Sequence, residues 1–593
     1  MTRASSHRWM AKSVAAVLVA AWACGSSQVA AIESSGADAG EKMTLADSHS
    51  LLGSYLAGRV ARYMRDGDKA VVYYQRALEK DPANPAIIED AFQLEIASGN
   101  FENAKRLAIQ IIKTKKEDRI ARIFLGLDAF KRKDYDRADM HFSIAGKATP
   151  GEPTVTLARA WVALAQNKPQ QALKLLDTLN KVEWADHFAA VHKAFIADIA
   201  RRRKTAAETY KALYEKNPNN ARVTEAYARH LAHWGDTARA IEILKAKGYP
   251  RNSAGAALLA DLEAGNKAKL LAANASEGMA EVFLGIGQVL VSNNGLDAAQ
   301  IYMRLALFLD PVSPIAQLEL GEVYGQIENY EKAIEVLSAV PDETPLGMTV
   351  NIRKALNLNS LGRVDEAIAI LERLRTKFPD ELQIPQTIAS IESGRKNYDA
   401  AIPHYTAAIN LVPTPEKKHW SLFYARGVAY ERTKQWPKAE ADFKKSLELD
   451  PEQAATLNYL GYSWLDQGMH LQEAMEMIRK AVKLRPNDGF IIDSLGWGYY
   501  LMKDYETALK HLERAVELRP EDPTLNDHLG DAYWQVGRKL EAQFQWSQAL
   551  TLNPEPEDAE EIRKKLKDGL TQDKSTHADA GESSAERAKP VGN

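Results

Sequence analysis

The sequence of 593 residues contains a single cysteine, Cys24, and carries almost no excess of charge. One cysteine excludes an intramolecular disulfide framework and a metal site built from several thiolates. The formal net charge of −3 gives no basic excess of the kind that nucleic-acid binding usually requires. We therefore expect neither a disulfide-stapled fold nor a nucleic-acid partner.

Motifs that would indicate catalysis are also missing. The sequence has no phosphate loop of the G-x-x-x-x-G-K-[ST] type, no H-E-x-x-H helix and no G-x-S-x-G elbow. His230 and His233 lie three residues apart and could share a metal ion, but such a pair is more often part of an ordinary helix surface, which is how we interpret them. We expect no enzyme, no cofactor and no metal, and a hydrolase with an unusual site stays a remote alternative.

Long apolar runs are scarce, and the clearest one lies near the N-terminus. Basic residues followed by an uncharged apolar run over 13–23 predict a secretory signal peptide in residues 1–31. The run is too short to span a bilayer comfortably. Two processing events compete: cleavage after Ala31, and attachment of a lipid to Cys24. The second rests on the position of the sole cysteine just after the apolar run and on Ala21-Trp22-Ala23-Cys24-Gly25, which resembles a bacterial lipobox. An uncleaved anchor is a third option. Either event predicts a periplasmic location, and the lipid would add an anchor to the outer membrane.

Both ends of the remaining chain lack core-forming residues. Residues 32–44 are rich in Gly, Ala, Ser and Glu, which predicts a flexible linker. Residues 570–593 contain almost no large apolar side chains, which predicts a disordered tail.

A repeat of about 34 residues occupies the rest of the chain. It is clearest between Phe423 and Pro554, where four glycines recur at intervals of 34, 35 and 34 residues: Gly427, Gly461, Gly496 and Gly530. Each glycine is followed by an alanine twelve or thirteen residues later: Ala439, Ala474, Ala508 and Ala542. A large apolar residue comes next: Phe443, Ile478, Leu512 and Trp546. A proline closes each unit: Pro451, Pro486, Pro520 and Pro554.

This order and spacing resembles the tetratricopeptide repeat, a helix–turn–helix unit whose stacked copies form a solenoid. The resemblance implies an all-α fold, a right-handed superhelical solenoid of about 14 repeats. Small residues at the glycine position, which we call the reference position, would let the two helices of a unit approach closely. Ala508→Trp should therefore overpack its unit.

The register of the repeat divides the chain into three blocks. Upstream reference positions fall at Gly58, Phe92, Gly126, Ala160, Ala194, Ala228, Gly287, Gly321, Ala355 and Ala389. The predicted blocks cover 45–252 with about six repeats, 279–412 with about four, and 420–569 with about four and an end helix. Residues 253–278 are predicted as a degenerate helical insert or hinge, and residues 413–419 as a loop.

The first helices of such repeats line a concave wall, on which partners of this family usually bind. We expect the exposed stripe at offsets −6, −3, +1 and +4 from the reference position. In the last repeats the predicted partner-binding residues are Asn458, Tyr462, Asp493, Trp497, Tyr500, Asp527, Asp531 and Trp534. A second, weaker candidate in repeats 3 to 5 consists of Ile123, Leu127, Phe130, Trp161, Phe188 and Phe195. For this apolar wall two alternatives stay open: a peptide groove, or a surface filled by the chain's own helices.

The segments Leu457-Asn458-Tyr459-Leu460-Gly461-Tyr462 and Asp493-Ser494-Leu495-Gly496-Trp497 resemble the large tetratricopeptide adaptors of Gram-negative envelopes. Members of that group include an outer-membrane lipoprotein that binds a carboxyl-terminal processing protease. The resemblance implies a non-catalytic scaffold that binds proteins or peptides and presents substrates to a periplasmic protease. The alternative is a scaffold of an envelope assembly or polysaccharide-export machine.

Overall fold

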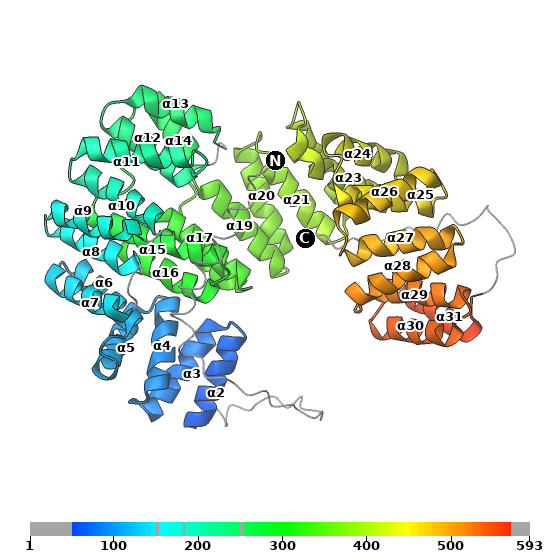
Figure 1. Ribbon diagram of the computed structural model, residues 1–593, viewed down its shortest axis with the longest axis horizontal. Coiled ribbons are helices and arrows are strands. Elements are labelled where there is room, and N and C mark those ends of the chain that lie inside the picture. The colour runs from blue at the N-terminus through cyan, green and yellow to red at the C-terminus, as the bar shows by residue number, and fades with distance from the viewer. Residues whose placement is uncertain (1–49, 149–152, 182–184, 250–252, 571–593) are drawn as a thin grey trace. The chain divides into compact units, whose positions relative to one another are not determined.

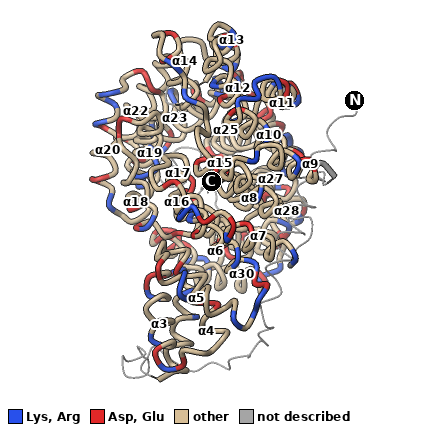
Figure 2. Tube along the Cα trace, turned by 90° about the vertical axis from the view of Figure 1, so that its left-hand side faces the viewer, with Lys and Arg blue, Asp and Glu red and all other residues tan. Residues whose placement is uncertain are grey.

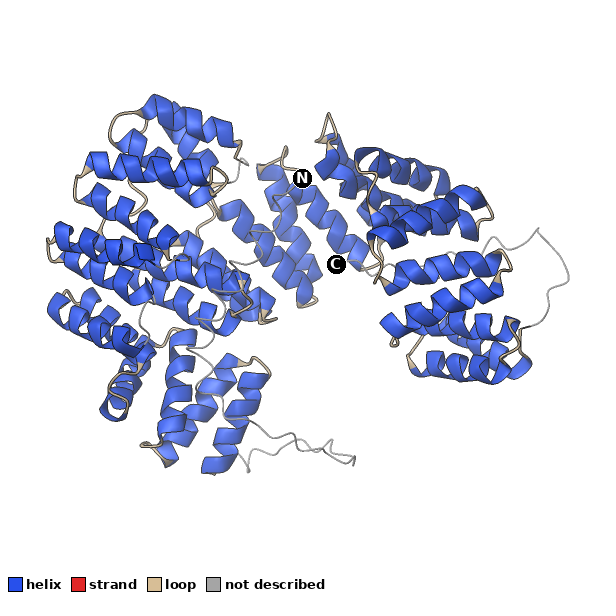
Figure 3. Cartoon of the chain, viewed as in Figure 1, coloured by secondary structure: helices blue, strands red, loops and turns tan. Residues whose placement is uncertain are grey.

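The computed structural model describes residues 50–148, 153–181, 185–249 and 253–570, and all regular structure within these ranges is helical (Figures 1 and 3). The expected all-α fold is confirmed. The chain forms two compact units, of which the first ends at Ile370 and the second begins at Leu371. The predicted signal peptide with Cys24, the linker, and the predicted tail except Leu570 lie outside the described residues. None of the described helices has the length and apolarity needed to cross a membrane.

Consecutive helices pack as antiparallel pairs, one pair for each predicted repeat. The first helices up to the unit boundary are α2 (Leu51–Tyr63), α4 (Pro85–Ser98), α6 (Arg119–Lys131), α8 (Pro153–Ala165), α10 (Asp186–Ile199), α12 (Ala221–His233), α15 (Ala275–Ser292), α17 (Pro314–Gln326) and α19 (Gly347–Ser360). Their second helices are α3 (Gly67–Lys80), α5 (Phe101–Thr114), α7 (Tyr135–Ala148), α9 (Pro169–Asp177), α11 (Arg203–Lys216), α13 (Thr237–Lys247), α16 (Leu296–Leu309), α18 (Tyr330–Leu337) and α20 (Val364–Lys377), the last of which contains the boundary.

The second unit continues the same pattern. Its pairs are α21 (Gln383–Gly394) with α22 (Tyr398–Asn410), α23 (Trp420–Arg432) with α24 (Trp436–Leu449), α25 (Ala454–Asp466) with α26 (Leu471–Leu484), α27 (Gly489–Leu501) with α28 (Tyr505–Leu518), and α29 (Pro523–Gln535) with α30 (Lys539–Thr551). A single helix, α31 (Pro556–Asp568), follows the last pair. The predicted insert contains the unpaired α14 (Ala254–Glu263) and the start of α15, and the predicted loop contains a short 3-10 helix, Lys417–His419. The boundaries of the three predicted blocks stay a prediction.

Close packing inside each pair explains the reference glycines. A Cβ atom on Gly126 would lie 2.8 Å from Cε1 of Phe142, which comes from the second helix of the same pair. The same relation joins Gly427 to Phe443 and Gly496 to Leu512, at 2.8 and 2.7 Å. The large apolar residue about sixteen positions after each glycine therefore sits where a side chain would otherwise be. The alanines that follow the reference positions are all fully buried: Ala70, Ala104, Ala138, Ala172, Ala206, Ala240, Ala299, Ala333, Ala367, Ala401, Ala439, Ala474, Ala508 and Ala542.

The turn inside each pair has a second regularity that the sequence pattern did not reveal. The residue seven positions after the reference adopts a left-handed backbone conformation in every pair. Glycine takes this position in some pairs, as Gly468 does with φ of 67°, but a lysine takes it in others, as Lys503 does with φ of 65°. Side chains other than glycine are strained in this region, so these turns differ in stability although they share one shape.

Charged residues are distributed along the helices without separation by sign. In Figure 2, blue and red segments are interspersed over the described helices. This distribution matches the near-neutral charge of the sequence.

Candidate functional site

The wall predicted in repeats 3 to 5 is covered by helices of the same unit. Helix α15 packs against α8 and α10, and α16 packs against α4 and α6; Figure 1 shows α15 and α16 beside α8 and α10. Five of the six predicted residues are buried: Ile123, Leu127, Phe130, Trp161 and Phe195. Phe188 is half-buried. The expectation of an exposed stripe is therefore wrong for this wall, and the alternative of a self-filled surface is correct.

Small residues on α15 let it lie flat on the aromatic side chains of the wall. Gly278 leaves no room for a Cβ atom, because the ring of Trp161 occupies that space. Seven residues later, a Cβ atom on Gly285 would lie 3.2 Å from Cε1 of Phe188. The Trp161 ring is fixed from the other side, since its Nε1 donates a hydrogen bond of 3.1 Å to Nδ1 of His192. The glycine spacing of α15 was the signal that could have predicted this contact.

One part of this wall remains open as a cavity of about 260 Å³ between α10–α12 and α15. Its lining includes Phe188, Val191, Phe195, Tyr210 and Arg222. Burial lowers the pKa of the adjacent His192 to about 3, so this imidazole is neutral at physiological pH. An engineered apolar cavity of about 150 Å³ accepts benzene, so the space here suffices for an apolar side chain.

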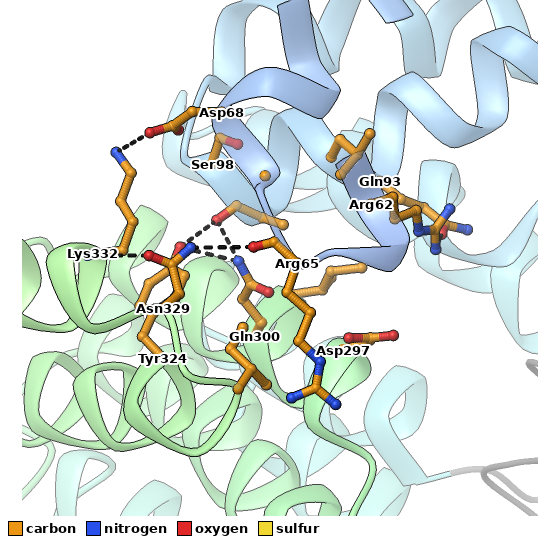
Figure 4. A pocket seen from close by; sticks show the side chains of 15 residues that line it. Arg62, Arg65, Asp68, Gln93, Ser98, Asp297, Gln300, Tyr324, Asn329 and Lys332 are labelled. Carbon is orange, nitrogen blue, oxygen red and sulfur yellow. Dashed lines mark hydrogen bonds and ion pairs between the residues drawn. The ribbon is translucent and has the colours of Figure 1, made fainter. Parts of the chain in front are cut away.

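A second, polar pocket lies where the first pairs of the unit meet α16 to α18 (Figure 4). Its volume is about 80 Å³, which is room for a few water molecules. The carbonyl oxygen of Ala97 accepts hydrogen bonds from Gln300, Arg304 and Tyr324, at 3.2, 3.0 and 3.1 Å. Because these polar groups bind one another, we interpret the pocket as part of a structural junction.

The wall predicted in the last repeats consists largely of side chains that bind one another. Trp497 stacks on Tyr500 with ring centroids 4.6 Å apart, and on His528 with centroids 4.0 Å apart. The Nδ1 atom of His528 lies 3.0 Å from both carboxylate oxygens of Asp493. Although burial opposes it, Asp493 raises the pKa of His528.

The end helix contributes a lysine that binds two further predicted residues. The Nζ atom of Lys565 donates to Asp527 and Asp531 at 2.8 Å. Trp546 Nε1 also donates to Asp531, at 2.9 Å. Burial and the neighbouring Asp527 raise the pKa of Asp531 to about 6. Burial acts against the charge on Lys565, but Asp531 and Asp527 raise its pKa. Sequence reasoning missed Lys565, because it lies outside the repeat pattern.

Burial is extensive on this wall too, so the expectation of an exposed stripe is also wrong here. Asn458, Tyr462, Asp493, Trp497, Asp527 and Asp531 are all buried. Tyr500 and Trp534 are half-buried. They pack in one cluster with Leu566 of the end helix and with Leu570, which lies just after that helix. Partner binding by these residues stays a prediction.

The two histidines considered as metal ligands have other partners. His230 is buried rather than exposed on a helix surface, and its Nδ1 lies 2.6 Å from Oδ1 of Asp198. The Nδ1 atom of His233 lies 3.1 Å from the carbonyl oxygen of Ala268. Within the described ranges, no three His, Cys, Asp or Glu side chains are placed to hold a metal ion.

Comparison with known sequences identifies the repeat in both units. Sequence models of the tetratricopeptide repeat match residues 61–123, 200–257, 284–348, 352–381 and 420–453, and a further repeat model of the same group matches residues 498–537. A repeat-containing protein of Pseudomonas aeruginosa is 28% identical over 186 residues, which are 31% of each chain. Human tetratricopeptide repeat protein 13 is 27% identical over 175 residues, 29% of this chain and 20% of that protein. The similarity therefore spans less than a third of either relative's length.

Solved structures with a similar course of the chain include the Cut9–Hcn1 hetero-tetramer of the APC/C, with a TM-score of 0.37 and 15% identity over 87% of this chain and 96% of that one. The MamA protein has a TM-score of 0.25 and 21% identity over 32% of this chain and 96% of its own. The helix pairs, the buried alanines and the matching repeat models lead to one conclusion: this chain is a member of the tetratricopeptide-repeat family.

Proposed function

We propose that this protein is a non-catalytic adaptor of the bacterial cell envelope, which holds partner proteins and presents substrates to a periplasmic protease. Tetratricopeptide repeats form protein–protein interaction scaffolds, and that general role follows from the family. The envelope location rests on the predicted signal peptide. The protease rests on the resemblance of the Asn458 and Asp493 segments to envelope adaptors.

The observation that supports a partner site best is the contact between Lys565 and the acid pair Asp527 and Asp531. Here the wall of the last pair already receives a lysine from a helix that is not part of a repeat. Tyr500 and Trp534 provide aromatic surface beside the acid pair. A partner segment with one basic and several apolar side chains would use the same groups. In this proposal, α31 occupies the site until such a segment replaces it.

Affinity purification from periplasmic extract tests the site, with the double variant Tyr500→Ala, Trp534→Ala as bait. We expect a protease and its substrates to co-purify with the wild-type protein and to be depleted with the variant. The matched control is Leu540→Ala, Phe544→Ala, because these side chains are 80% and 68% exposed on the neighbouring α30. An unchanged set of partners with the double variant would contradict the site.

The same experiment distinguishes the alternative function. Recovery of outer-membrane assembly or polysaccharide-synthase components, without a protease, would favour the scaffold of an envelope machine. Fractionation and intact-mass analysis test the location: a lipid on Cys24 predicts a membrane-bound chain that begins at this residue. Cleavage after Ala31 predicts a chain that begins at Ile32.

A further inference from the structure

The first described helix, α2, carries an apolar face that none of the described helices covers. Five side chains along one side of its length and at its end are exposed by 48–89%: Leu52, Leu56, Val60, Tyr63 and Met64. The spacing of Leu52, Leu56 and Val60 is one helical turn, so they form a continuous stripe. Terminal repeats of a solenoid ordinarily present a polar outer face. An uncovered stripe of this length therefore needs a partner.

The face has a known use in the other repeats of this unit. Leu56 and Val60 lie two residues before and after the reference Gly58. Two positions before the reference positions of the third to sixth repeats the residues are buried: Phe124, Ala158, His192 and Ala226. In the second repeat this position is the half-buried Asp90. The residues two positions after the reference positions are buried as well: Leu94, Val162, Ile196 and His230. Phe124, for example, packs on Phe101 of α5, with ring centroids 6.3 Å apart.

Later first helices thus use this face to pack on helices of the preceding pair: Phe124 of α6 contacts Phe101 of α5, and His192 of α10 contacts Trp161 of α8. Helix α2 has the same face, and within the described residues, which begin at residue 50, no pair precedes it. Its shape consequently suits one more α-helix, packed side by side. This geometry favours a helical partner over an extended peptide.

The charges of α2 indicate which charge the partner helix should carry. The sequence Leu51–Tyr63 contains two arginines and no acidic residue. Arg62 is paired with Asp90 at 3.0 Å, but Arg59 and the following Arg65 are exposed. A helix with acidic residues beside its apolar stripe would complement them.

The last described helix, α31, does not match this face. Helix α31 exposes charged residues of both signs: Glu557, Glu560, Arg563, Lys564, Lys567 and Asp568. Only Ala559 and Ile562 of this helix are buried. A head-to-tail contact between copies would place these charges against Leu56 and Val60, which is unfavourable.

We infer that α2 is a docking surface for an acidic amphipathic helix of a partner protein, which extends the helical stack by one element. The inference rests on the proposed scaffold function and adds a second site, distinct from the C-terminal wall. The partner helix presents apolar residues at i, i+3 or i+4, and i+7 to Leu52, Leu56 and Val60. Its flanking carboxylates approach Arg59 and Arg65.

Binding of a designed peptide tests this surface directly. The probe is a fluorescein-labelled amphipathic helix with leucines at i, i+3, i+4 and i+7 and glutamates on both flanks. A charge-reversed twin carries lysines instead. Fluorescence anisotropy with the full-length protein should show saturable binding of the glutamate peptide and weaker binding of the lysine twin. The variant Leu56→Glu, Val60→Glu should weaken binding by about tenfold or more, since it places like charges in an apolar contact.

The matched control is Leu540→Glu, Phe544→Glu, which changes two exposed apolar residues elsewhere and should leave binding unchanged. Because Leu56 and Val60 are half-exposed, their replacement should not disturb folding, and circular dichroism checks this. Equal binding of both peptides, or binding that the α2 variant leaves intact, overturns the inference. So does a homodimer that dissociates in the α2 variant, because a second copy then occupies the face. The purification with Tyr500 and Trp534 variants is independent of all these outcomes.

Discussion

The ring of Trp161 on α8 occupies the place that a side chain at Gly278 of α15 would need. Through this contact, α15 packs closely against the wall formed by α8 and α10. Replacing glycine by alanine inside a helix ordinarily stabilises it by about 1 kcal/mol. For Gly278→Ala we expect the opposite, a loss on the order of 1–3 kcal/mol, because the added methyl group overlaps the indole.

Thermal or chemical unfolding of Gly278→Ala measures the effect, with Gly67→Ala as the matched control. Gly67 has no heavy atom within 4 Å of the position of an added Cβ. A Gly278→Ala protein as stable as the wild type would show that α15 does not rest on Trp161.

Overpacking inside a repeat tests the register in the second unit. Ala508 is a fully buried residue of α28. Ala508→Trp should lower the free energy of unfolding by about 1–3 kcal/mol. Lys510→Trp, on the exposed side of the same helix, should change it little. Equal melting temperatures of the two variants would contradict the register.

Replacing a residue other than glycine at the left-handed turn position by glycine should increase stability. Lys503 adopts φ of 65° where Gly468 stands in the preceding pair. Lys503→Gly should stabilise the second unit by up to about 1 kcal/mol, because glycine adopts this conformation without strain. Gly468→Ala should cost a similar amount. Denaturant unfolding of both variants measures the pair, and effects of the same sign would refute the explanation.

Loss of the lysine on the end helix should expose the acid pair to its own repulsion. Lys565→Met leaves Asp527 and Asp531 without their common cation, and we expect a loss of about 3–5 kcal/mol. Faster amide exchange of α31 should accompany it. Lys567→Met, on the exposed side of α31, serves as the control. Unchanged exchange of α31 in the Lys565 variant would mean that other contacts hold the helix.

The acid pair also predicts a dependence on pH. The pKa of Asp531 is about 6, above the value of about 3.9 in an unfolded chain. The folded protein therefore binds this proton more tightly, and the resulting stabilisation is full below about pH 4 and is lost as the pH rises through 6.

Asp531→Asn removes this ionisation. The difference in unfolding free energy between wild type and variant should fall by about 1 kcal/mol from pH 5 to pH 7. His528, with its raised pKa, contributes in the same direction, but it is present in both proteins. A difference that stays constant over this range would show that Asp531 does not titrate there.

Local periodicity predicted the helix pairs well, because their main determinants are close in sequence. Gly126 and Phe142 lie sixteen residues apart, and their contact recurs in other pairs. The sequence did not decide whether the apolar wall of repeats 3 to 5 is a peptide groove or is covered by the chain's own helices. Trp161 and Gly278 are more than a hundred residues apart, and the repeat specifies only contacts between neighbouring units. The exposure of the predicted stripe was wrong for the same reason. Lys565 and the histidines His192 and His528 were missed because they occupy positions without a family signature.

The packing of α15 on α8 and α10, and of α16 on α4 and α6, has a consequence for how the first unit unfolds. A repeat array with nearest-neighbour contacts alone can lose its end pairs one at a time. Here, release of α8 would also uncover α15, and release of α16 would uncover α4. Separate pairs thus share one contact network, and the unit should melt as a cooperative block. Its rigidity would then come from long-range closure, a property that the repeat itself does not supply.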